Sequence, residues 1–153
     1  MISGKDIVTN ARTWLGTKYH HQGRLKKNYA SNGGVDCIGL IMGVAMELRL
    51  VGADGKLLAE FDETSYSPYP DGVRLKQFLD LHLKNIDTNQ IKLGDVLLFK
   101  LFSQPQHVGI ASNYFSGGIG IIHCYSGSGQ VVEHYLSAAW QRMLVGIYRF
   151  SYQ

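Results

Sequence analysis

The chain has 153 residues, which is enough for one domain and too few for two full ones. Hydrophobic residues make up 45% of the chain and charged residues 18%, a composition that supports a buried core and excludes the disordered class. The net charge of +3 is too small to indicate nucleic-acid binding, and no apolar run is long enough to predict a membrane-spanning helix. We therefore expect a single domain over residues 1–153, with no nucleic-acid partner and no membrane insertion.

The first residues and the cysteines indicate the compartment. No basic segment followed by an apolar one opens the chain, so no secretory signal peptide is predicted and synthesis in the cytoplasm is expected. Cys37 and Cys124 are too few for a disulfide scaffold, and cytosolic thiols usually remain reduced. Arg24, with Lys26 and Lys27, forms the one local basic cluster and is interpreted as part of a solvated loop.

Helical patterns dominate the first half of the chain. Residues 3–15 combine a Ser3–Asp6 pair typical of a capping box with apolar residues at helical spacing. Further helices are predicted over residues 36–51 and 71–83, separated by an irregular segment.

Strand patterns dominate the second half. Turn residues alternate with short apolar runs there, and a helical turn over residues 137–142 precedes the last run. Because helices come first and strands follow, we predict an α+β fold with N-terminal helices packed on a C-terminal antiparallel β-sheet. The predicted strands cover residues 96–100, 107–112, 119–125, 130–135 and 144–150.

Cys37 is the first candidate for chemistry, because it stands at the first turn of a predicted helix and follows a glycine-bearing loop. Unpaired backbone N–H groups and the positive end of the helix dipole converge at such a position. That environment lowers the pKa of a thiol and favours the nucleophilic thiolate. The alternative interpretation is a structural cysteine that packs as a small hydrophobic residue.

His107 and His123 are predicted to meet in a β-hairpin. Alternation places His107, Gly109 and Ala111 on one face of a strand, where two small residues accompany the histidine. If the hairpin is centred on Phe115, His107 and His123 lie directly opposite each other on the same face, whereas a slip of one residue would separate them. The alternative is an ordinary hydrogen-bonded histidine at the start of a strand.

Together Cys37, His107 and His123 provide the nucleophile, the base and the orienting group of covalent acyl transfer. Cys37 would attack a carbonyl carbon and form a thioester. His107 would take the thiol proton and give it to the leaving amine, while His123 fixes the tautomer of His107. The backbone N–H of Cys37 is the expected oxyanion donor.

Five short motifs occur in an order typical of one enzyme superfamily. Residues 36–40, Asp-Cys-Ile-Gly-Leu, carry the candidate nucleophile, and residues 107–110, His-Val-Gly-Ile, carry the candidate base. Gly-Thr-Lys-Tyr at 16–19, Gly-Asp-Val-Leu-Leu-Phe at 94–99 and Ile-His at 122–123 complete the set. The chain thereby resembles the NlpC-type superfamily of cell-wall cysteine endopeptidases, although Lys18 and Ile38 replace the proline and serine most frequent there.

The resemblance implies a papain-like fold and a cysteine peptidase that needs no cofactor and no metal. Its implied substrate is the peptidoglycan stem peptide, cut between D-γ-glutamate and a diamino acid through a thioester acyl-enzyme. It also implies that Tyr19 lies beside the nucleophile and the oxyanion site, and that Asp36 contacts the substrate. Segments 14–22 and 140–150 look most like the phage-associated branch, which implies phage tail proteins as partners and delivery to the cell wall with a phage particle.

Three other functions are compatible with the same residues. An acyltransferase of related fold would use the same triad and would need an apolar groove. A non-catalytic phage tail or wall-binding protein would carry the triad as a relic. A zinc site built from Cys37, Cys124, His107 and His123 has suitable ligand types but lacks the usual close ligand spacing, and strand alternation turns Cys124 away from His123.

Overall fold

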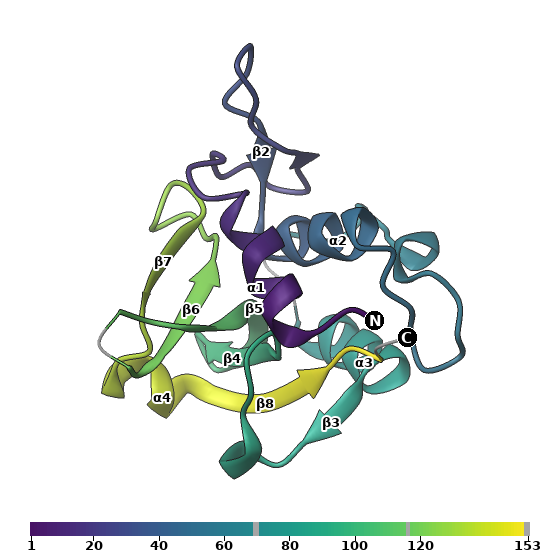
Figure 1. Cartoon of the computed structure of the whole chain (residues 1–153), viewed down its shortest axis with the longest axis vertical. Helices are drawn as coiled ribbons and strands as arrows, with labels where there is room; N and C mark the ends of the chain where they lie inside the picture. Colours follow the sequence, from purple (N-terminus) through teal and green to yellow (C-terminus); the bar gives the residue numbers. More distant parts are fainter. Residues whose placement is uncertain (69–70, 116, 152–153) are drawn as a thin grey trace.

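A six-stranded antiparallel sheet forms the C-terminal half of the fold, and helices pack against it (Figure 1). The computed structural model describes residues 1–68, 71–115 and 117–151. Its elements in chain order are α1 (Gly4–Arg12), β1 (Arg24–Leu25), β2 (Gly34–Val35), α2 (Cys37–Glu47), the 3-10 helix η1 (Leu58–Phe61), α3 (Val73–His82), β3 (Lys84–Ile86), the 3-10 helix η2 (Thr88–Gln90), β4 (Val96–Leu101), β5 (Gln104–Asn113), β6 (Ile119–His123), β7 (Val132–Tyr135), α4 (Ala138–Met143) and β8 (Leu144–Arg149).

The strand order explains why β5 is central to the molecule. The sheet runs β3-β8-β4-β5-β6-β7, and each neighbouring pair is antiparallel. Helices α1, α2 and α3 contact β5, whereas α4 contacts β4. The structure therefore confirms the predicted α+β class, with N-terminal helices packed on a C-terminal antiparallel sheet.

Local sequence signals set the starts of the two N-terminal helices. Before α1, the Ser3 N–H donates to the Asp6 carboxylate at 2.7 Å and the Asp6 N–H donates to the Ser3 hydroxyl at 3.2 Å, which is the predicted capping box. Before α2, the Asp36 carboxylate accepts the N–H of Gly39 at 2.8 Å. Asp36 is therefore the N-cap of α2, and Cys37 is the first residue inside the helix.

Several boundaries differ from those expected. The helix α1 ends at Arg12 instead of residue 15, and α2 ends at Glu47 instead of residue 51. The short strands β1, β2 and β3 were not predicted, because two or three residues are too few to show strand alternation. In the described parts of the chain, no helix has both the length and the apolar character needed to cross a membrane.

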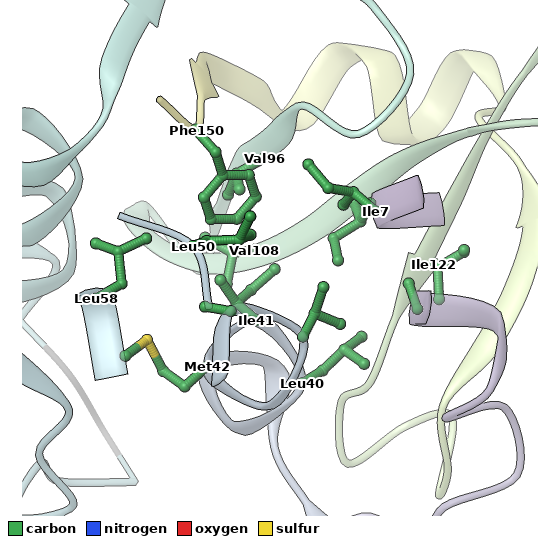
Figure 2. Close-up of a cluster of buried hydrophobic side chains, with 14 of the residues drawn as sticks. Ile7, Leu40, Ile41, Met42, Leu50, Leu58, Val96, Val108, Ile122 and Phe150 are labelled. Atoms are coloured by element: carbon green, nitrogen blue, oxygen red, sulfur yellow. The ribbon is translucent and has the colours of Figure 1, made fainter. Parts of the chain in front are cut away.

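The core on the helix-facing side of the sheet determines which way the β5 side chains point. Ile7 of α1 and Leu40 of α2 pack there with Val108 and Ile122 of the sheet, and all four are at most 2% exposed (Figure 2). Since side chains alternate along a strand, His107 points to the other side of β5. A second buried cluster covers that side and consists of Ile86, Leu97, Phe99, Ala111, Ile121, Leu136 and Ile147.

Candidate active site

A cleft of about 860 Å³ opens between the N-terminus of α2 and the beginning of β5. Cys37 and His107 line it together, so the fold brings the predicted nucleophile and base to one cavity. Tyr19 and Asp36 also line it. The opposite wall comes from the segment after α2 and from α3, through side chains that include Phe61, Tyr66, Leu75 and Phe78.

Cys37 meets the backbone of β5. The N–H groups of Val108, Ile38 and Cys37 itself approach the sulfur and act to lower the pKa of the thiol. Burial nevertheless raises the pKa of Cys37 to about 12, and the negative charge of Asp36 adds to the rise. The expectation of a thiol pKa lowered by the helix start is therefore wrong, because burial outweighs the helix N–H groups.

The Val108 N–H belongs to the peptide group that joins His107 to Val108. The Cys37 sulfur therefore lies beside the backbone of the predicted base. Among the described residues, no hydrogen bond joins this sulfur to the His107 ring.

Asp36 is buried at 5% exposure, and its two oxygens accept four hydrogen bonds. Oδ1 accepts from the Gly39 N–H and from the Arg24 guanidinium, at 2.8 and 3.3 Å. Oδ2 accepts from the Gln22 N–H at 2.8 Å and from the Tyr66 hydroxyl. A carboxylate has about four acceptor positions, so a substrate donor at Asp36 would have to displace or share one of these bonds.

Arg24 and Tyr66 both bond Asp36, and the sequence pattern missed these contacts. Arg24 bonds Asp62 at 2.9 Å and Tyr66 at 3.0 Å, and so ties the start of β1 to the segment that forms the far wall of the cleft. The interpretation of Arg24 as part of a solvated loop is wrong. Its partners lie 38 and 42 residues away along the chain, so no local pattern could have revealed them.

His107 and His123 meet as predicted, but in a different register. His107 Nε2 lies 2.8 Å from His123 Nδ1. Ile110 pairs with Ile122, so the two histidines are diagonal neighbours and the expectation that they are directly opposite is wrong. The displacement is two residues, which keeps both side chains on the same face. A Cβ on Gly109 would lie 3.1 Å from the Cβ of His123, so glycine leaves the room that this contact needs.

Aromatic rings enclose the histidine pair. Trp140 lies with its ring centroid 4.8 Å from that of His123 and 5.8 Å from that of His107, and Tyr125 lies 5.1 and 5.6 Å from the same rings. His123 is 0% exposed and His107 is 3% exposed. Burial lowers the pKa of His107 to about 3 and that of His123 to about 2, so both rings are neutral near pH 7. The sequence pattern did not assign either aromatic residue to the site.

A third histidine lies behind the pair. His134 on the edge strand β7 has its Nε2 atom 2.7 Å from Nε2 of His123. The register pairs His123 with Val132 and Ile121 with His134, so the two histidines are diagonal neighbours across β6 and β7. The sequence pattern placed His134 in a strand but gave it no role.

Tyr19 is held by backbone contacts beside the nucleophile. Its N–H donates to the Gly129 carbonyl at 2.9 Å, and the residue forms a parallel bridge with Val35. Burial raises the pKa of Tyr19, and the charges of Asp36 and Cys37 add to the rise, so its hydroxyl carries a proton that it can donate.

Cys124 does not join the histidines. It is fully buried and donates from its sulfur to the Val35 carbonyl at 3.4 Å. Within residues 1–68, 71–115 and 117–151, no group of three or more histidine, cysteine or acidic side chains is arranged to hold a metal ion.

Comparison with known proteins identifies the family of the chain. The NlpC/P60 family model matches residues 16–149. Among solved structures, an NlpC/P60 family protein from Bacillus cereus aligns with 97% of this chain and 40% of its own, at 17% identity and a TM-score of 0.64. The NlpC/p60 domain of the peptidoglycan hydrolase SagA aligns with 97% of this chain and 99% of its own, at 20% identity and a TM-score of 0.56.

An N-acetylmuramoyl-L-alanine amidase from Bacteroides uniformis shares the fold as well. It aligns with 97% of this chain and 99% of its own, at 17% identity and a TM-score of 0.57. A search of curated proteins finds no match to the sequence. At these identities the solved structures show the fold, whereas the family model covers most of the chain. The chain therefore belongs to the NlpC/P60 family.

Proposed function

We propose that this protein is a cysteine peptidase or amidase that hydrolyses amide bonds in peptidoglycan stem peptides. Membership of the NlpC/P60 family supports a cell-wall peptidase. The observation that carries the proposal is the cleft itself, which is lined by both His107 and Cys37 at the start of α2. The hydrogen bond between His107 and His123 supports His123 as the proposed third member of the triad.

The proposed reaction begins from a neutral thiol and a neutral imidazole. Burial raises the pKa of Cys37 and lowers that of His107, so the proton stays on the sulfur before the reaction. It moves to His107 only as the sulfur attacks the carbonyl carbon. His107 then gives that proton to the nitrogen of the amine as the C–N bond breaks, and a thioester remains on Cys37. Water, deprotonated by His107, attacks the thioester and releases the acid and the thiol.

Backbone N–H groups at the start of α2 would stabilise the negative charge that develops on the carbonyl oxygen during each attack. The backbone N–H groups of Cys37 and Ile38 already approach the sulfur, where the reacting carbonyl would also lie. The protonated hydroxyl of Tyr19 lines the same cleft and is proposed as a further donor.

The bond we propose is the one between D-γ-glutamate and a diamino acid, on the strength of the sequence motifs. The cleft wall carries side chains of both charges, with Arg74 and Glu63 forming an ion pair there. A stem peptide with carboxylates and an amino group would find partners of either sign. Asp36 remains the proposed substrate contact beside the nucleophile, through Oδ2, which accepts hydrogen bonds from the Tyr66 hydroxyl and the Gln22 N–H.

Mass spectrometry of purified muropeptides incubated with the protein tests this proposal. We expect new fragments with a free amine, and their masses identify which amide is cut. Cys37→Ala should abolish cleavage, whereas Cys124→Ser, which keeps a donor for the Val35 carbonyl, should retain it. Equal cleavage by the parent and Cys37→Ala would refute a cysteine mechanism, and release of intact stem peptides would identify an N-acetylmuramoyl-L-alanine amidase instead.

An acyltransferase is the second candidate, because much of the cleft wall is apolar. Met42, Phe61, Leu75 and Phe78 form a surface next to Cys37 on which an acyl chain would pack favourably. Incubation with phospholipid vesicles and with muropeptides, followed by analysis of both products, separates the candidates. Turnover of phospholipid alone would replace the peptidase assignment.

Association with a phage particle belongs to the same proposal and is supported by the motifs at residues 14–22 and 140–150. The expected partners are phage tail proteins, and the expected place of action is the cell wall. Immunoblotting of purified phage particles tests it. Absence of the protein from every particle fraction would refute the association but would leave the proposed hydrolysis unaffected.

A further inference from the structure

Three histidine rings form a continuous row that leads away from the cleft. His107 Nε2 contacts His123 Nδ1 at 2.8 Å, and His123 Nε2 contacts His134 Nε2 at 2.7 Å. The row ends where His134 Nδ1 contacts the carbonyl oxygen of Tyr135 at 2.8 Å. Each of the three rings comes from a different strand, namely β5, β6 and β7.

The Tyr135 carbonyl determines the direction in which the three rings donate hydrogen bonds. A carbonyl oxygen only accepts hydrogen bonds, so Nδ1 of His134 must carry the proton. In a neutral His134 ring, Nε2 is then an acceptor, and Nε2 of His123 must carry the proton that it donates there. By the same argument Nδ1 of His123 accepts, and Nε2 of His107 carries a proton and donates it.

This direction leaves Nδ1 of His107 without a proton. Nδ1 is the nitrogen that His123 does not occupy, so it is the atom that can take the proton from the Cys37 thiol. The opposite direction would put a proton on Nδ1 and block that step. The tautomer needed for catalysis is thus determined two rings away, at the Tyr135 carbonyl.

We propose that His134 is a positioning residue, which acts through His123 to hold His107 in the tautomer with the proton on Nε2. The catalytic consequence rests on the proposed function, whereas the tautomer does not. His134 does not line the cleft, so it acts on the base without touching the substrate. Its partly exposed ring packs against Trp140, with centroids 5.9 Å apart.

NMR of the protein with isotope-labelled histidine tests the tautomer without any substrate. Long-range proton–nitrogen correlations should show protons on Nε2 of His107 and His123 and on Nδ1 of His134. His134→Leu removes the acceptor, so His107 should become a mixture of both tautomers. His134→Gln keeps an acceptor oxygen within reach of His123 and should preserve the native tautomer. A native His107 tautomer in His134→Leu would overturn the proposal.

Kinetics on muropeptides test the catalytic consequence. His134→Leu should lower kcat by about 10- to 100-fold with KM unchanged, as happens when orienting partners of histidines are removed from metal sites. His134→Gln should recover most of the loss, and the exposed His20→Gln should behave like the parent. Equal losses in the Leu and Gln variants, or a change confined to KM, would refute positioning.

Failure of the proposed function and failure of the positioning role of His134 would give different results. If the parent cleaves no muropeptide but His134→Leu still changes the His107 tautomer, the proposed function fails and the positioning role stands. If His134→Leu does not fold, His134→Gln and His134→Asn supply the comparison. The Asn side chain is too short to reach His123 in place of Nε2, so it should show the mixed tautomer that Gln avoids.

Discussion

The buried histidine pair should make the protein unstable in mild acid. Burial lowers the pKa of His107 to about 3 and that of His123 to about 2, whereas both rings titrate near pH 6.5 in an unfolded chain. Between these values the unfolded state binds more protons than the folded state, so acid favours unfolding. The stability that the pair retains above pH 6.5 is therefore lost as the pH falls below it.

The size of the effect follows from proton linkage. Each histidine that stays neutral in the fold costs about 1.4 kcal/mol per pH unit once the pH is well below its unfolded value. For two histidines, the free energy of unfolding should fall by about 2 kcal/mol between about pH 6.5 and about pH 5.5. A typical domain has only about 5–15 kcal/mol in total, so the change is measurable.

Urea unfolding followed by tryptophan fluorescence at a series of pH values measures this change. The matched control is the double variant His107→Gln and His123→Gln, which keeps polar side chains but cannot titrate. The difference in stability between the parent and the control should shrink steadily as the pH falls. A difference that grows as the pH falls through 6.5 would mean that the folded histidines are already charged, and would favour a thiolate–imidazolium pair over the neutral pair. A difference that does not depend on pH would mean that the rings titrate alike in the folded and unfolded chain, which would refute the lowered pKa values.

Three further predictions concern single residues near the site. Gly109→Ala places a methyl group 2.7 Å from Ile121 Cδ1 and against β6, so muropeptide turnover should fall on the order of 100-fold while circular dichroism shows a retained fold. Asp36→Ala removes the cap of α2 and should lower the free energy of unfolding in urea by about 2 kcal/mol or more; an unchanged value would refute its structural role. Gly43→Ala directs a methyl group to within 2.2 Å of the Trp14 ring and should cost about 1–3 kcal/mol, and a stable variant with unshifted tryptophan fluorescence would contradict this packing.

Local sequence patterns predicted some features of the site and missed others. Cys37 at a helix start and the histidines on neighbouring strands were predicted from spacing, because caps and strand alternation involve residues close in sequence. The register between β5 and β6 was predicted two residues away from its actual value. A hairpin centre inferred from the loop alone takes no account of the contacts that β6 makes with β7 and Trp140.

The amino-acid order alone determined the α+β class, the helix and strand succession and the residues that can carry thiol chemistry. These depend on periodicity and on contacts over a few positions. The tertiary structure decided the four donors on Asp36, the row that ends at His134 and the neutral state of Cys37 and His107. Such features depend on solvent exclusion and on contacts between distant segments, and both exist only once the helices and strands have packed together.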